Sequence, residues 1–83
     1  MAIVKTASFE AIRLVVKAGD RIAAHRVAGR ITLHCLEGRV LLGLPETSME
    51  LGAGQWVYLD GGTEHSLRGI EDSSLLLTIM FEG

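Results

Sequence analysis

Few residues of this chain can do chemistry, and two histidines stand out by their spacing. His25 follows the turn-like triplet Ala18-Gly19-Asp20, and His65 follows the similar triplet Ala53-Gly54-Gln55. An imidazole can ligate a metal, accept a hydrogen bond or move a proton near neutral pH. Both histidines are therefore candidates for contact with a small molecule, for acid–base work or for metal ligation. The alternative is structural, with both rings hydrogen-bonded inside the fold.

Cys35 is the only cysteine, so it forms no disulfide within the chain. In an extended segment Cys35 shares the parity of Ile31 and Leu33, which would turn its thiol toward the interior and let it join two imidazoles on a metal. No basic residue adjoins it in sequence, which favours a buried and unreactive thiol instead. His34 has the opposite parity, so we expect it on the surface or at an interface.

Two aromatic residues complete the candidate set. Trp56 and Tyr58 alternate with Val57 and Leu59, so one pair faces the interior and the other faces outward. Inward-facing aromatic rings would form one wall of a ligand pocket, and core packing is the alternative role. The candidate pocket residues are His25, His65, Cys35, Trp56 and Tyr58.

The elements that must position these residues are short. Ten glycines and one proline separate brief apolar runs, and most pieces are too short for helices. Residues 10–17 also fit a helical period, but their β-branched content and the Gly19-Asp20 stop favour a strand. About seven short strands with frequent turns predict an all-β sandwich or barrel. The clearest strand candidates are residues 10–17, 30–36, 39–44, 49–51, 55–59 and 74–81, with a hairpin loop at 45–48.

Composition limits the partners. The chain has 83 residues, 48% apolar and 22% charged, and a formal net charge of −2. This length supports one hydrophobic core, so we expect a single domain over residues 1–83. The apolar content, and a last strand that is apolar on both faces, predict a homodimer. The lack of a basic cluster argues against a nucleic acid or an anionic membrane as partner.

The termini and the single cysteine predict a location. No run reaches the roughly 18 apolar residues of a membrane span, and the first residues lack the apolar core of a secretion signal. A lone cysteine gives no disulfide framework of the secreted type. We therefore expect a cytoplasmic protein.

Spacing in the first half of the chain resembles the first signature motif of the cupins, which are small jelly-roll β-barrels. Gly19 and His25 stand at the motif's spacing, and Gly38 stands where its closing glycine belongs. Two positions depart from the motif. Val27 replaces the second histidine of its H-x-H pair, and Ile31 replaces its glutamate.

The second half resembles the second cupin motif. Gly54, Gly62 and His65 match, whereas Asp60 replaces a proline and Gly69 an asparagine. The two motifs in order span residues 17–81, and this resemblance implies a cupin double-stranded β-helix barrel. In metal cupins the histidines and the glutamate of these motifs hold the metal, and two of those ligand positions are aliphatic here.

Three classes of function remain. We prefer a metal-free or metal-degenerate barrel that binds an unknown small molecule, because the stretch His25-Arg26-Val27-Ala28-Gly29 resembles small stand-alone cupins that lack the glutamate. One alternative is a metal-dependent enzyme of dioxygenase or isomerase type, with a divalent transition metal on His25, His65 and Cys35. The other is a structural or interaction dimer whose barrel is filled. Cavity volume separates them, since an open cavity of about 300 Å³ or more would support binding, and closure by Leu33, Trp56 or Tyr58 would argue against it.

Overall fold

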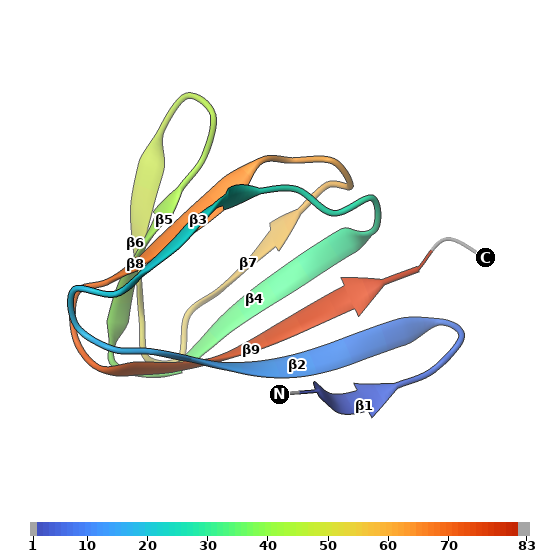
Figure 1. Cartoon of the computed structure of the whole chain (residues 1–83), viewed down its shortest axis with the longest axis horizontal. Coiled ribbons are helices and arrows are strands. Elements are labelled where there is room, and N and C mark those ends of the chain that lie inside the picture. Colours follow the sequence, from blue (N-terminus) through green and yellow to red (C-terminus); the bar gives the residue numbers. More distant parts are fainter. Residues whose placement is uncertain (1, 82–83) are drawn as a thin grey trace.

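The computed structural model describes residues 2–81, and in this part of the chain it contains strands and connecting turns (Figure 1). No helix that could cross a membrane occurs among these residues. Nine strands are present within them: β1 (Ala2–Lys5), β2 (Phe9–Val16), β3 (Arg21–His25), β4 (Arg30–Glu37), β5 (Arg39–Gly43), β6 (Ser48–Gly52), β7 (Trp56–Leu59), β8 (His65–Gly69) and β9 (Ser73–Met80).

The six segments predicted most clearly as strands correspond to β2, β4, β5, β6, β7 and β9, with ends shifted by a residue or two. The count of about seven was too low. β1, β3 and β8 were not among the predicted segments. Nearly all residues of β1 and β3 are exposed, and β8 alternates regularly but is only five residues long.

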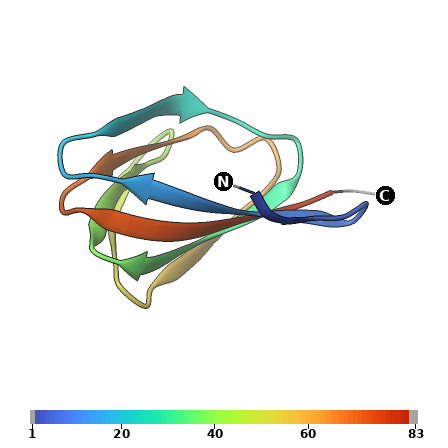
Figure 2. The ribbon, with the colours of Figure 1, turned by 60° about the horizontal axis from the view of Figure 1, so that its bottom comes forward.

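The strands form two antiparallel sheets that face each other (Figures 1 and 2). One sheet has the order β1-β2-β9-β4-β7, and the other has the order β3-β8-β5-β6. The chain passes from one sheet to the other between β2 and β3 and again between β4 and β5. This is the small jelly-roll barrel expected from the motifs. The β1–β2 hairpin lies at the same end of the molecule as the end of β9.

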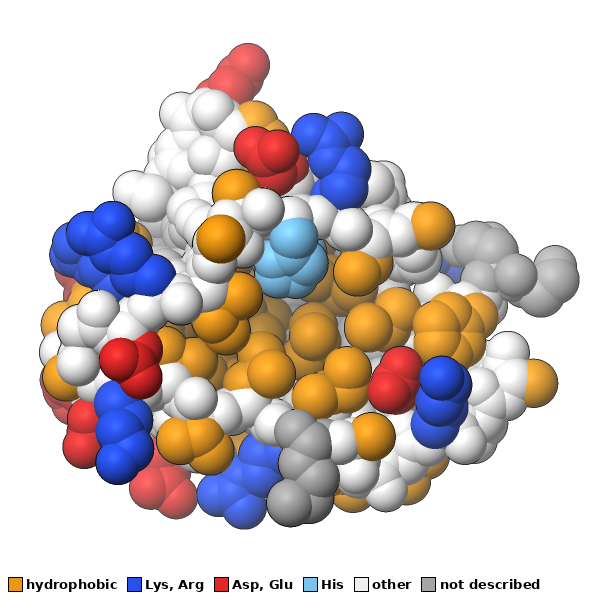
Figure 3. All heavy atoms as spheres, in the orientation of Figure 1, with side chains coloured by type: hydrophobic (Ala, Val, Ile, Leu, Met, Phe, Trp, Pro, Cys, Tyr) orange, Lys and Arg blue, Asp and Glu red, His pale blue; other side chains and the backbone are white. Residues whose placement is uncertain are grey.

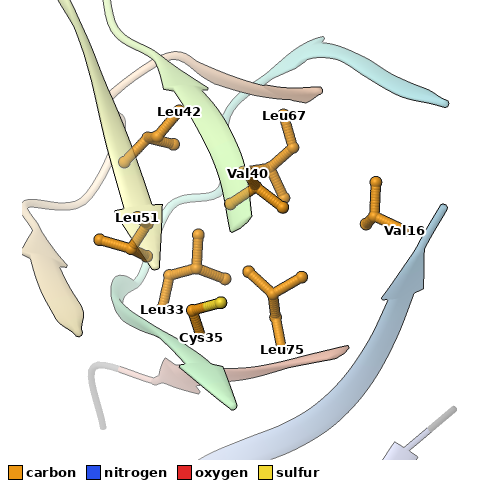
Figure 4. Packing of buried hydrophobic residues seen from close by; sticks show 8 residues of the cluster. All are labelled: Val16, Leu33, Cys35, Val40, Leu42, Leu51, Leu67 and Leu75. Carbon is orange, nitrogen blue, oxygen red and sulfur yellow. The ribbon is translucent and has the colours of Figure 1, made fainter. Parts of the chain in front are cut away.

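Alternation along the strands builds the interior. Val16, Leu33 and Leu75 point inward, whereas Val15 and Leu76 point outward, because neighbouring residues of a strand face opposite sides. The buried residues form one cluster that joins both sheets (Figure 4). Its members are Val16, Leu33, Cys35, Val40, Leu42, Leu51, Leu67 and Leu75.

Four glycines have positive φ, between 81° and 87°, and they are the four predicted to occupy the turns: Gly19, Gly38, Gly54 and Gly62. This conformation is costly for residues with a Cβ atom. Gly38 carries a second constraint, because a Cβ atom there would collide with the carbonyl oxygen of Asp72 and with Ser73. The chain crossing between β4 and β5 therefore requires glycine for two independent reasons.

Candidate functional site

The interior of the barrel contains a cavity of about 120 Å³ between the two sheets. Its lining comes equally from both: Leu14, Ile31, Leu33 and Leu77 from the five-stranded sheet, and Ile22, His25, His65 and Leu67 from the four-stranded sheet. Figure 3 shows hydrophobic side chains gathered in a hollow at the centre of one face, with a histidine at its edge. Six of the eight lining residues are aliphatic, so the two imidazoles supply the only polar groups among them.

His25 faces this cavity because β3 contains an irregularity. Ile22 pairs with Leu67 and His25 pairs with His65, so two residues of β3 lie opposite the single residue Ser66 of β8. In a regular strand Ile22 and His25 would point to opposite sides, because they are three residues apart. The extra residue is a β-bulge, which reverses the alternation and lets both side chains face inward.

Main-chain carbonyl groups orient both rings. The Nδ1 atom of His25 lies 3.1 Å from the carbonyl oxygen of Ala23, and Nδ1 of His65 lies 2.9 Å from that of Thr63. A carbonyl oxygen only accepts hydrogen bonds, so each Nδ1 must be the donor. In the neutral imidazole the proton is then on Nδ1, and Nε2 carries a lone pair that can accept a hydrogen bond.

The two histidines differ in exposure although they are adjacent. Their ring centroids are 4.4 Å apart with an angle of 58° between the planes. His65 is only 5% exposed, whereas His25 lies at the exposed side of the pair. No fully buried side-chain nitrogen or oxygen within residues 2–81 lacks a hydrogen-bond partner. Nε2 of His65 makes no such bond there, so it must remain accessible from the cavity.

An aliphatic side chain lines this cavity at the position where the cupin motif has a metal-binding glutamate. Ile31, at the position of the glutamate in the cupin motif, is 2% exposed and lines the same space as the two imidazoles. Val27 does not reach the cavity lining. Catalytic zinc and non-haem iron sites use three protein ligands, and no three His, Cys, Asp or Glu side chains gather in this way among residues 2–81. The donor set therefore does not fit the metal of metal-dependent cupins.

Cys35 faces inward as its parity predicts, but it does not join the histidines. Its side chain is fully buried in the core cluster, and Sγ lies 3.3 Å from the carbonyl oxygen of Glu37. Burial raises the pKa of the Cys35 thiol above its usual range. The alternative of a metal on His25, His65 and Cys35 finds no support, because Cys35 lies in the core cluster and is not among the residues that line the cavity with the two imidazoles.

Trp56 and Tyr58 are not pocket residues either. Both face outward from β7, where Trp56 is 62% exposed and the Tyr58 hydroxyl lies 3.1 Å from Oδ1 of Asp60. Their strand neighbours Val57 and Leu59 take the inward positions, with Leu59 buried. The predicted alternation along residues 56–59 is present, and the tertiary structure decides which pair of side chains faces the interior.

The cavity residues that the sequence did not single out are aliphatic: Leu14, Ile22, Leu67 and Leu77. One signal was available, since Leu67 shares strand parity with His65. The bulge in β3 removes the corresponding signal for Ile22. At about 120 Å³ the cavity does not reach the volume of about 300 Å³ that would have supported binding of an ordinary ligand. Its volume favours a filled barrel or a ligand smaller than usual.

Comparison with solved structures supports the topology. No protein-family model and no curated protein matches the sequence. A conserved protein of unknown function from Streptococcus pyogenes has a TM-score of 0.91 at 18% identity, over 99% of this chain and 72% of that chain. A cupin superfamily protein from Desulfitobacterium hafniense has a TM-score of 0.93 at 12% identity, over 99% of this chain and 75% of that chain.

An RmlC-like cupin from Desulfovibrio desulfuricans has a TM-score of 0.88 at 21% identity, over 95% of this chain and 77% of that chain. Identities this low concern the fold alone. The similarity concerns the arrangement of the two antiparallel sheets. The chain has the double-stranded β-helix fold of the cupin superfamily.

Proposed function

We propose that this barrel binds a small, mostly apolar molecule that carries one or two hydrogen-bond donors. The observation that carries the proposal is the pair of imidazoles whose Nδ1 atoms are held by carbonyl groups of the main chain. With Nδ1 donating, Nε2 of each neutral ring is left as an acceptor at an otherwise aliphatic cavity. A hydroxyl or amine group of a ligand would satisfy it.

Cavity size limits the ligand. A volume of 120 Å³ is somewhat below the roughly 150 Å³ of an apolar cavity known to hold benzene. The bound part of the ligand is therefore about the size of one small ring or a short branched chain, with any remainder extending through the hollow seen in Figure 3. Such a ligand gains from burial of its apolar surface by about 25 cal/mol per Å².

Phenol is a suitable probe because it combines one small ring with one O–H donor, and toluene is the matched probe without the donor. We expect phenol to shift the amide resonances of β3, β8 and β9 in a saturable way. Toluene should bind about tenfold more weakly, since one hydrogen bond is worth about 1 kcal/mol or somewhat more. Equal binding of the two probes would refute the role of the imidazoles.

Variants locate the binding. His65→Leu should reduce the preference for phenol over toluene, and Leu77→Trp should abolish binding of both by filling the cavity. His34→Leu is the control, because His34 lies on the outer face of the same barrel between Leu76 and Trp56. If neither probe binds the wild-type protein, the proposal fails in favour of a filled barrel.

We also infer that two copies pair through the outer face of the five-stranded sheet. This outer face comprises the outward residues Val15, Leu36, Trp56, Tyr58 and Leu76. Val15 is 68% and Trp56 is 62% exposed, and exposed large apolar side chains on one face of a sheet are candidates for an interface. A dimer with a two-fold axis would bury this patch against itself, and a chain of 83 residues benefits from the added burial.

The oligomeric state tests this second proposal. We expect wild-type protein to have the mass of a dimer by light scattering at micromolar concentration. Trp56→Glu should convert it to a monomer, since an unpaired charge would be buried in the interface. Met49→Glu is the control, because Met49 is an exposed apolar residue of the other sheet. A monomeric wild-type protein, or a dimer that survives Trp56→Glu, would refute the proposed face.

A further inference from the structure

The outside of the four-stranded sheet carries a second concave surface, separate from the barrel interior. This surface forms an open groove of about 390 Å³, which is lined by residues of β3, β5 and β8. Ile22 and Leu67 line both this groove and the interior cavity, so they form the wall between the two. The groove has more than three times the volume of the interior cavity, although its open side leaves it more exposed to water.

Two arginines lie side by side at this groove. Arg21 of β3 and Arg68 of β8 are direct partners in the antiparallel pairing, and both line the groove. Like charges directly opposite each other on one face of a sheet destabilise the pairing. Both arginine side chains are exposed.

Neither arginine has an acidic partner. Within residues 2–81, ion pairs join Arg26 to Glu64 at 3.2 Å and Arg39 to Glu50 at 3.4 Å, and none involves Arg21 or Arg68. No Asp or Glu lies among the described residues that line the groove. The groove therefore has two positive charges in a chain whose net charge is −2.

Small residues line the groove beyond the arginine pair. The β3 bulge places Ala23 and Ala24 opposite Ser66, and all three line the groove. Gly43 of β5 lies beside them, where a Cβ atom would collide with Oγ of Ser66. These four positions thus offer a hydroxyl donor and no large side chain.

We propose that this groove binds an oxyanion, the phosphate or carboxylate group of a small molecule, between the guanidinium groups of Arg21 and Arg68. A guanidinium group presents paired N–H donors whose geometry matches the oxygens of a carboxylate or phosphate. The bound anion removes the repulsion across β3 and β8, and the Ser66 hydroxyl supplies a further donor. Leu41, next to Arg68 across the β5–β8 pairing, would contact an apolar part of the ligand.

The test is a titration of the whole chain with inorganic phosphate, phenyl phosphate and benzoate, followed by amide resonances at an ionic strength held constant with sodium chloride. We expect saturable shifts confined to β3, β5 and β8, with half-saturation in the millimolar range. Saturation by the phosphates alone identifies a phosphoryl ligand, saturation by benzoate alone identifies a carboxylate, and either result supports the proposal. Shifts that merely follow total salt would overturn it.

Charge-matched variants complete the test. Arg21→Gln and Arg68→Gln should each weaken binding about tenfold, since each removes a charge-assisted hydrogen bond. Arg26→Gln makes the same change in net charge at an arginine outside the groove, and it should bind like the wild type. All three side chains are exposed, so folding should be preserved. Equal losses in Arg26→Gln, or unchanged binding in the double variant of Arg21 and Arg68, would contradict the site. Neither Arg21 nor Arg68 lines the interior cavity. The result of the phenol titration is therefore independent of the result of this anion titration.

Discussion

The rings of His25 and His65 lie 4.4 Å apart, and each is held through Nδ1 by the carbonyl oxygen of the residue two positions before it. The same local geometry thus recurs at the end of β3 and at the start of β8, which are paired at these two residues. In a neutral imidazole held in this way Nε2 carries the lone pair, and both rings line the interior cavity. The main chain therefore fixes the orientation of both rings.

Removal of the two histidines should have unequal effects on stability. His65→Ala should lower the free energy of unfolding by about 2 kcal/mol, because it removes a buried side chain and leaves the Thr63 carbonyl oxygen without its donor. His25→Ala should cost less than about 1 kcal/mol, since His25 is exposed. Urea unfolding followed by Trp56 fluorescence measures both. Similar costs for the two variants would contradict the burial difference.

A carboxylate at position 31 should create a metal site. Ile31→Glu adds a third ligand to the space lined by the two imidazoles, giving the two-histidine, one-carboxylate set used by many metal enzymes. Without metal the buried charge should cost about 3 kcal/mol. Zinc at one hundred times its Kd should restore about 2.7 kcal/mol.

Thermal unfolding with and without zinc measures this effect. The matched control combines Ile31→Glu with His25→Ala and should lose most of the response to zinc. The prediction is wrong if zinc stabilises the wild type as strongly as it stabilises Ile31→Glu.

The turn glycines should separate into two classes. Gly38→Ala should cost about 3 kcal/mol or prevent folding, because the new Cβ atom adds a collision with main-chain oxygen of Asp72 to the strain of positive φ. Gly54→Ala has nearly the same φ but no atom within 4 Å of the added Cβ, so it should cost only about 1 kcal/mol. Chemical denaturation of both variants tests the difference. Equal losses would mean that φ alone sets the cost.

Cys35 should be unreactive in the folded protein. It is fully buried, and burial raises its pKa, so both access and thiolate formation are suppressed. A thiol-specific disulfide reagent should react at least about 100-fold more slowly with native protein than with protein in urea, since reaction requires opening of the core. Rapid stoichiometric labelling without denaturant would disprove this expectation.

The same residue predicts how stability depends on pH. As pH rises past the ordinary thiol pKa of about 8.5, the unfolded chain ionises first, because the pKa is raised only in the folded state. This contribution to stability is therefore complete below pH 8 and is lost as pH rises toward the folded-state value. A Cys35→Ala variant lacks it, so the stability difference between wild type and variant should shrink between pH 8 and pH 10. A constant difference would show that burial leaves the pKa unchanged.

Local sequence patterns predicted much of the fold. Strand alternation fixed which residues of β2 and β4 face inward, and it placed His34 outside and Cys35 inside. The four positive-φ glycines were identified because their spacing matched turns of the cupin motifs. β3 and β8 were not among the predicted strands, and in β3 a bulge and exposed small residues disturb the alternation.

The candidate site was only partly predictable. Alternation shows that Trp56 and Tyr58 share a face, but the choice between inside and outside depends on pairing with β4, which sets Tyr58 beside Thr32 and Trp56 beside His34. The depth of Cys35 relative to the imidazoles likewise depends on how the two sheets pack. No pattern within a single strand contains that information.

The sequence by itself determined six of the nine strands within residues 2–81, the turn glycines and the aliphatic residue at position 31, because each follows from local backbone preference or from residue identity. Tertiary structure alone decided that His25 faces His65, because a bulge in β3 opposite Ser66 reverses the direction of the side chain. It also brought Arg21 beside Arg68, from strands far apart in the chain. Both pairs depend on register between β3 and β8, and register is set by packing of the whole barrel rather than by either strand.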